Sequence, residues 1–116
     1  MLHELFLEDG LLGLTEEHDI VYREDPKPNA PVTDMVLAPQ NVQVSEMISP
    51  SEVMLFRYSA LTFNGHRIHY DANYARAVEG YDGLVFHGPL TATLLIDLAK
   101  RTVGRSPKSF KFKGSR

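Results

Sequence analysis

The hydrophobic residues near the N-terminus follow a pattern typical of extended chain. Leu2–Leu7 is rich in leucine, and Asp19–Arg23 contains isoleucine, valine and tyrosine, which favour strands. A polar stretch that contains Gly10 and Gly13 lies between the two segments. The pattern predicts a strand hairpin over residues 1–25.

A proline-rich stretch follows this hairpin. Proline has no backbone N–H and fits poorly inside helices or central strands. We therefore interpret residues 26–48 as a linker and residues 49–116 as the main domain. Four prolines carry this interpretation: Pro26, Pro28, Pro31 and Pro39.

The main domain is predicted to begin with short elements. Pro50 and a neighbouring serine predict a helical turn, followed by a strand at Leu55–Leu61. Asp71 is a suitable N-cap for a short helix over Ala72–Val78, and Gly80 is expected to end that helix.

The C-terminal part predicts a strand, a long helix and another strand. Asp82-Gly83 predicts a turn into a strand at Leu84–Phe86, and a helix follows over about Pro89–Thr102. Gly104 is expected to end this helix, and Ser109–Lys113 alternates like a strand. A helix that is apolar around most of its circumference is enclosed by other elements. We therefore predict an α+β domain in which a curved antiparallel sheet wraps around the helix. Its apolar residues are Leu90, Ala92, Leu94, Leu95, Ile96, Leu98 and Ala99.

Composition narrows the class of protein. The 116 residues are 43% hydrophobic and 23% charged, which is ordinary for a globular domain. The formal net charge of -3 argues against a nucleic-acid partner, and the absence of cysteine excludes thiolate chemistry. The N-terminus does not resemble a signal peptide, and no stretch is long enough to span a membrane. We expect a cytoplasmic protein.

Two runs of sequence carry the most specific chemistry. Arg57–Asp71 (RYSALTFNGHRIHYD) places Asn64 five residues before His69, and His87–Arg101 (HGPLTATLLIDLAKR) places Gly88 directly before an apolar helix. Imidazole accepts protons near neutral pH, an amide can orient water, and the first N–H groups of a helix can bind a carbonyl oxygen. The set suggests a catalytic pair that faces a helix N-terminus, where a carbonyl oxygen could bind, and it requires no metal or redox cofactor.

The run Leu55–Ala99 resembles the hotdog-fold acyl dehydratases and (R)-specific enoyl-thioester hydratases of the MaoC-like group. Within that group it is most similar to the branch of mesaconyl-CoA (3-methylfumaryl-CoA type) hydratases and mitochondrial 3-hydroxyacyl-thioester dehydratases. The resemblance extends to Arg116, and EEHDIVYRE (residues 16–24) is weakly similar to a preceding subdomain. It implies a hotdog fold and a hydro-lyase whose substrate is an acyl-CoA or acyl-carrier thioester.

The resemblance also implies roles for residues. His69 falls on the family's catalytic histidine, and Asn64 falls where the family usually has an aspartate. Because an amide cannot act as a base, the implied role of Asn64 is positioning. Stabilisation of the turn at Asn64-Gly65 is an alternative. The backbone N–H of Gly88 would bind the thioester oxygen.

Five further residues are candidates for substrate binding. Arg67 could pair with a substrate carboxylate or a CoA phosphate, or lie on the surface without a ligand. Tyr58, Thr62 and Tyr70 could line the acyl pocket or belong to the core. We expect His87 to be a packing or turn residue beside the substrate rather than a second base.

A complete hotdog sheet needs more strands than residues 49–116 supply. We therefore predict an abbreviated domain, incomplete at its C-terminus, with residues 1–25 as the remnant of a preceding subdomain. Exposed strand edges and apolar surface favour a homodimer or higher oligomer. Two alternatives stay open. One is an inactive relative that binds acyl-CoA or serves in assembly. The other is a hotdog thioesterase, which would need a carboxylate from Glu79, Asp82 or Asp97.

Overall fold

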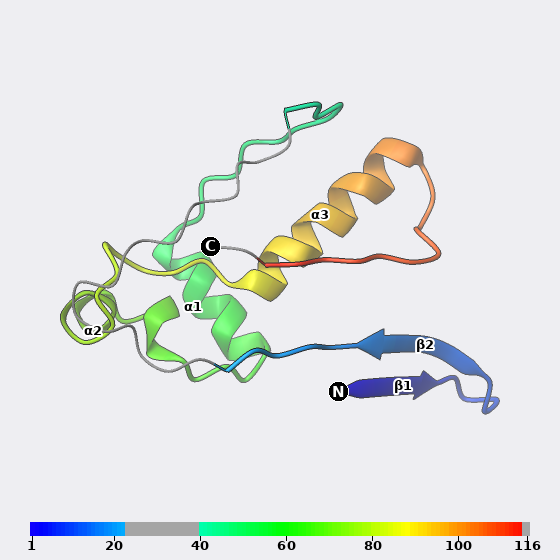
Figure 1. Cartoon of the computed structure of the whole chain (residues 1–116), viewed down its shortest axis with the longest axis horizontal. Helices are drawn as coiled ribbons and strands as arrows, with labels where there is room; N and C mark the ends of the chain where they lie inside the picture. The colour runs from blue at the N-terminus through cyan, green and yellow to red at the C-terminus, as the bar shows by residue number, and fades with distance from the viewer. Residues whose placement is uncertain (23–39, 115–116) are drawn as a thin grey trace. The chain divides into compact units, whose positions relative to one another are not determined.

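The computed structural model describes residues 1–22 and 40–114 (Figure 1). The chain divides into two units, Met1–Asp34 and Met35–Arg116, which we describe separately. Residues 26–39 of the predicted linker lie outside the described residues, and the three-part division of the sequence stays a prediction. The elements in chain order are β1 (Leu2–Phe6), β2 (Leu12–Glu17), α1 (Glu52–Leu61), the 3-10 turn η1 (Arg67–His69), α2 (Ala72–Ala77) and α3 (Gly88–Val103).

The first unit contains an antiparallel hairpin of β1 and β2. Its register pairs Leu2 with Glu17 and Leu5 with Leu14, and a bulge follows Leu5. Gly10 turns the chain with a φ of 81°, a left-handed conformation that glycine adopts without a steric penalty. The hairpin is therefore specified by its turn and its pairing.

One predicted strand of this hairpin is confirmed and the other is wrong. Leu2–Leu7 contains β1, as predicted. The strand predicted at Asp19–Arg23 is misplaced, because β2 ends at Glu17 and residues 19–22 form no strand. Arg23 lies outside the described residues. The chain reverses directly after β1, so the pairing is complete before the β-branched residues are reached.

The strand predicted at Leu55–Leu61 is also wrong, because these residues belong to helix α1. Ser51 caps this helix by accepting a hydrogen bond from the Met54 N–H at 3.2 Å, and Glu52 adds a carboxylate to the first turn. The helical turn predicted at Pro50 therefore continues, because extending a formed turn costs less than nucleating one.

The helix predicted after Asp71 is confirmed as α2. The Asp71 carboxylate accepts a hydrogen bond from the Tyr74 N–H at 2.9 Å, as an N-cap does. The strand predicted at Leu84–Phe86 is wrong, and these residues are irregular. Val85 N–H donates to the Ile68 carbonyl at 2.9 Å. The segment therefore bonds to η1 instead of to a neighbouring strand.

The helix predicted over about Pro89–Thr102 is confirmed as α3, which ends at Gly104 with a left-handed φ of 72°. The strand predicted at Ser109–Lys113 is wrong, because this segment is irregular. The two-stranded sheet and the helices confirm the α+β class. No sheet encloses α3 within residues 40–114, where Leu90 is its one buried side chain, because the segments predicted as strands are helical or irregular. None of the helices in the described chain is long and apolar enough to cross a bilayer.

The core of the second unit is small and partly polar. Burying a polar group costs free energy unless the group is hydrogen-bonded. The buried polar residues of this core therefore need hydrogen-bond partners, which restrict how the surrounding elements can pack. The buried hydrophobic residues are Leu55, Ile68, Ala75 and Leu90, and the buried polar residues are Ser59, His69 and His87.

Candidate active site

His69 lies at the end of η1 with its imidazole almost fully buried. Its Nδ1–H donates to the Val85 carbonyl at 2.7 Å. Its backbone N–H donates to the His66 carbonyl at 3.3 Å, closing the 3-10 turn. The carbonyl fixes the tautomer of the neutral ring, because a carbonyl only accepts hydrogen bonds. The lone pair of His69 is therefore on Nε2, the nitrogen that can take a proton.

His87 stacks directly on His69. The ring centroids are 3.7 Å apart and the rings are inclined by 18°. His87 is completely buried, its Nε2 lies 2.9 Å from the Ser59 Oγ, and Tyr58 meets it edge-on at 4.8 Å. Burial, and then the charge of nearby His69, hold the pKa of His87 below its usual value. His87 is thus an uncharged ring between α1 and η1.

Asn64 is held by the way α1 ends. Its N–H donates to the Ser59 carbonyl at 2.9 Å, and Phe63 adopts a left-handed φ of 53°. This is the helix-ending arrangement that usually has glycine at the position of Phe63. The Asn64 Oδ1 accepts a hydrogen bond from the His66 N–H at 3.0 Å. This contact is the turn-stabilising alternative, and a role for Asn64 toward a substrate stays a prediction.

Gly88 is the first residue of α3 and follows the buried His87. The first N–H groups of a helix have no partner within it, and they carry the positive end of the helix dipole. The backbone of Gly88 is open, because an added Cβ would meet no atom within 4 Å. Gly88 is exposed, and it lies one residue from the ring that stacks on His69.

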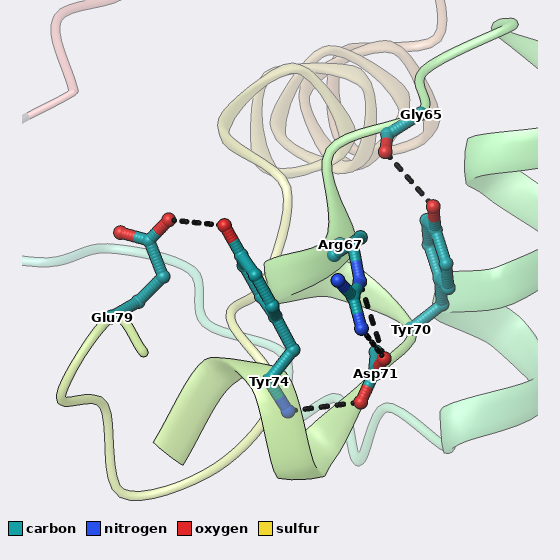
Figure 2. Close-up of polar contacts among 6 residues, drawn as sticks. All are labelled: Gly65, Arg67, Tyr70, Asp71, Tyr74 and Glu79. Atoms are coloured by element: carbon teal, nitrogen blue, oxygen red, sulfur yellow. Dashed lines mark hydrogen bonds and ion pairs between the residues drawn. The ribbon is translucent and has the colours of Figure 1, made fainter. Parts of the chain in front are cut away.

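Arg67 belongs to an exposed polar cluster on the outer side of η1 (Figure 2). Its Nη2 donates to Asp71 Oδ2 at 2.7 Å, and its guanidinium lies 4.1 Å from the centre of the Tyr74 ring. The Tyr74 N–H and then the guanidinium hold the pKa of Asp71 below its usual value. The carboxylate in turn raises the pKa of Arg67. The structure thus places Arg67 against a carboxylate of its own chain.

Other hydroxyls brace the loop around η1. Tyr70 donates to the Gly65 carbonyl at 2.9 Å, and Tyr74 donates to Glu79 at 3.2 Å (Figure 2). The bond to Glu79 raises the pKa of Tyr74. On α1, Thr62 donates to the carbonyl of the preceding turn at 2.8 Å. These hydroxyls hold the backbone in place.

A shallow apolar hollow of about 380 Å³ lies along α1 beside the start of α3. Of the residues predicted to line an acyl pocket, Tyr58 is the one that borders it. Leu90 joins it from α3, next to the open backbone of Gly88. The remaining lining residues are Ser51, Val53, Met54, Arg57 and Leu61.

The structure brings together only some of the predicted site residues. His69, His87 and Tyr58 are in contact, and Gly88 follows His87 in the chain. Sequence reasoning missed Ser59. The available signal was a small polar residue interrupting an apolar run, which does not by itself indicate a partner.

The chain belongs to the hydroxyacyl-thioester dehydratase type 2 family, whose description matches residues 3–116. It is 48% identical over 103 residues to the mesaconyl-C(4)-CoA hydratase of Chloroflexus aurantiacus, an alignment that covers 89% of this chain and 37% of that protein. It is 41% identical over 69 residues to the mitochondrial hydroxyacyl-thioester dehydratase type 2 of Schizosaccharomyces pombe, covering 60% of this chain and 23% of that protein.

The protein of the same name from Saccharomyces cerevisiae is 30% identical over 82 residues, 71% of this chain and 29% of its own length. These relatives confirm the branch expected from the sequence. The chain spans between about a quarter and two fifths of the length of these relatives.

Proposed function

We propose that this chain contributes the catalytic centre of a hydro-lyase that adds water to an enoyl thioester or removes it from a 3-hydroxyacyl thioester. One observation carries the proposal. His69 has its tautomer fixed by Val85, and its ring stacks on the residue that precedes the first turn of α3. The proposed base is thus linked to the start of α3 through the ring of His87. Membership of a dehydratase family supports this reading.

The proposed reaction uses these groups in sequence. His69 Nε2 takes a proton from water as the water oxygen attacks the β-carbon of the enoyl group. Negative charge moves to the thioester oxygen, where the Gly88 N–H and the helix dipole stabilise it. His69 then returns a proton to the α-carbon. The C=C bond is replaced by one C–O and one C–H bond, so water is added without an oxidant, a metal or a redox cofactor.

The remaining predicted residues have supporting roles in this proposal. Asn64 lies between α1 and η1 and would orient water through its amide N–H groups, since its oxygen is bonded to His66. Tyr58 and Leu90 would contact the acyl chain along the hollow. Arg67 would meet a substrate carboxylate or CoA phosphate only by sharing or leaving Asp71. Thr62 and Tyr70 would act by holding the backbone.

The substrate class follows from the relatives' names. One is a mesaconyl-C(4)-CoA hydratase and the others are hydroxyacyl-thioester dehydratases. We propose acyl-CoA or acyl-carrier thioesters as substrates, with a mesaconyl-like acyl group as one candidate. The cytoplasmic location expected from the sequence stays a prediction.

We further propose that the working assembly is at least a dimer in which a hotdog sheet encloses α3. The second unit exposes large apolar side chains: 57% of Phe56 and 78% of Leu61 are accessible. Exposed apolar area of this kind is covered in stable assemblies. A monomer in sedimentation velocity at micromolar concentration would contradict the dimer.

A second candidate function is an inactive acyl-CoA-binding or assembly subunit. The observation that favours it is Asn64, which replaces a carboxylate and whose oxygen is occupied by His66 N–H. The thioesterase alternative is weaker. Of its candidate carboxylates, Glu79 accepts from Tyr74 and Asp97 pairs with Arg101, and none of the three, Asp82 included, has a hydrogen bond or ion pair with His69 or His87 in the described residues.

The test is an absorbance assay that follows loss of the conjugated double bond in crotonyl-CoA, mesaconyl-CoA and longer enoyl-CoA thioesters. Loss of a general base costs about 10²–10⁴ in rate, so we expect that fall for His69→Ala. His3→Ala, in the hairpin, is the matched control and should keep the wild-type rate. Equal rates for His69→Ala and wild type would remove His69 from the mechanism. Binding of the thioesters without turnover would favour the inactive subunit.

A further inference from the structure

The burial and hydrogen bonding of His87 are not explained by a role in packing or in a turn. It is the largest fully buried side chain in the described residues, and as N-cap of α3 its side chain makes no capping hydrogen bond. Its Nδ1 is the one buried side-chain nitrogen or oxygen without a hydrogen-bond partner in that part of the chain. A buried imidazole with one unpaired nitrogen is costly, and a phenyl ring would fill the same volume without that cost. Packing alone therefore does not account for His87.

The contact with His69 offers an explanation for a histidine at position 87. Two imidazolium rings 3.7 Å apart would repel strongly in a buried site, so at most one of the two rings carries a positive charge. His87 is the more deeply buried ring, and burial disfavours its charged form. His87 is therefore the ring that stays uncharged.

Ser59 connects this pair to the rest of the site. Its Oγ lies 2.9 Å from His87 Nε2, and its carbonyl accepts the N–H of Asn64 at 2.9 Å. One buried residue of α1 thus bonds to the ring that stacks on His69 through its side chain, and to the backbone of Asn64 through its carbonyl. Removing the Ser59 hydroxyl would break only the first of these contacts.

We propose that Ser59 and His87 are positioning residues: Ser59 fixes the ring of His87, and His87 holds the face of His69 while staying uncharged itself. The role in catalysis rests on the proposed function, whereas the proton distribution does not. His69 alternates between neutral and charged forms during water addition, and a neutral His87 supports both forms without taking the proton.

The groups around the stack are compatible with this arrangement. From α1, the Tyr58 ring meets His87 edge-on, and from the start of η1 the His66 ring meets His69 edge-on at 5.6 Å. Glu79 lies 4.0 Å from His66 Nε2, and the charges of Arg67 and Asp71 are paired with one another. The α3 side contributes Thr91, whose N–H and hydroxyl donate to the His87 carbonyl, and no charge.

The first test reads the proton directly. Nitrogen NMR of ¹⁵N-histidine-labelled full-length chain, recorded between pH 8 and pH 5, reports the tautomer and charge of each of the five histidines. Single His→Gln variants assign the signals. We expect His87 to stay neutral across this range, and His69 in its neutral form to be the Nδ1–H tautomer. In His69→Gln, His87 should become protonated at higher pH than in wild type, because the competing charge is gone. Independent protonation of both rings, or protonation of His87 first, would overturn the proposal.

The second test reads the consequence for catalysis. Ser59→Ala should lower kcat by about 10-fold to 100-fold with little change in KM, because only the alignment of the base is lost. Ser59→Thr, which restores the hydroxyl, should recover part of that loss. An unchanged kcat in Ser59→Ala would overturn the positioning role. A wild-type chain that hydrates no thioester but shows the expected NMR pattern would overturn the proposed function and leave the proton distribution standing.

Discussion

The hairpin and the segment of residues 51–90 are both formed by local contacts, but they differ in how much they bury. Both are closed by local devices: a glycine turn and paired strands in the first, an N-capping serine and aspartate in the second. Yet in the hairpin only His3 is even half-buried, whereas the segment buries Ser59, His69 and His87. Local chemistry is enough to form an element. A site requires contacts between elements.

The two regions also use histidine differently. In the hairpin, His3 lies 2.6 Å from Glu16 with both side chains about half exposed, so solvent screens their attraction. In the segment, His69 and His87 stack away from solvent and each has a bond that fixes its ring. Only the stack of His69 on His87 restricts which ring can be charged. We therefore propose that catalysis takes place in the segment and not in the hairpin.

The first prediction concerns a variant of the segment that lacks one backbone N–H. Gly88→Pro deletes the proposed carbonyl-oxygen donor at a helix position that tolerates proline, and His87 already has backbone angles suited to a following proline. Loss of one such donor costs about 10²–10³ in kcat. Gly88→Ala keeps the N–H and has room for its Cβ, so it should lose far less. Equal losses in the two variants, measured in the enoyl-CoA assay, would exclude a donor role.

The next effect concerns burial and compares the two regions directly. Leu90 is 6% exposed and Leu5 is 54% exposed. We expect Leu90→Ala to lower the free energy of unfolding by about 2–3 kcal/mol and Leu5→Ala by less than about 0.5 kcal/mol. Urea denaturation followed by circular dichroism measures both. Similar losses would mean that the hairpin is packed against something in solution.

A third prediction separates the regions by pH. The pKa of buried His87 is lowered in the folded state, so the unfolded chain binds its proton first. Stability of the segment should therefore fall once the pH drops below about 6.5, the usual value for histidine. The pKa of Glu16 is lowered by its bond to His3, so its contribution is present above the usual carboxylate pKa and lost only in more acidic solution.

Amide NMR signals of the two regions, followed from pH 7.5 to pH 4, measure this difference. We expect the signals of α1 and η1 to weaken before those of the hairpin, and His87→Phe to remove the early change. Loss of the hairpin signals first would contradict the assignment.

The smallest effect concerns the strained end of α1. Phe63 has a left-handed backbone and a side chain that is 96% exposed. Its side chain therefore makes little contact within the described residues that could offset the backbone strain. Phe63→Gly should raise the free energy of unfolding by about 1 kcal/mol. Thermal unfolding compared with wild type tests this. A lower stability would show that the Phe63 ring makes contacts in solution that outweigh the strain of its backbone.

Helices α2 and α3 could be predicted because the residues that cap them, Asp71 and Gly104, are recognisable in the sequence. The strand predicted at Leu55–Leu61 failed because aromatic content is a weaker signal than the Ser51 cap that starts α1. The strands predicted at Leu84–Phe86 and Ser109–Lys113 failed for another reason. A strand exists only with a hydrogen-bonded neighbour, and the sequence of one segment cannot supply it.

The site was predictable to a similar extent. His69 and Gly88 could be identified because their neighbours form a recognisable pattern, and their roles stay predictions. The contact between Ser59 and His87 could not be found, because these residues are separated by 28 positions and meet only through the packing of α1 beside the start of α3. Arg67 and Tyr70 have obvious chemistry, but their partners turned out to be Asp71 and a backbone carbonyl.

The most direct measurement of the central claim is product analysis after incubation of the chain with crotonyl-CoA or mesaconyl-CoA in D₂O. We expect a 3-hydroxyacyl-CoA that carries one deuterium at the α-carbon, and none of this product with His69→Gln. Unchanged enoyl-CoA would contradict the claim, as would free CoA with a released acid, the product of a thioesterase.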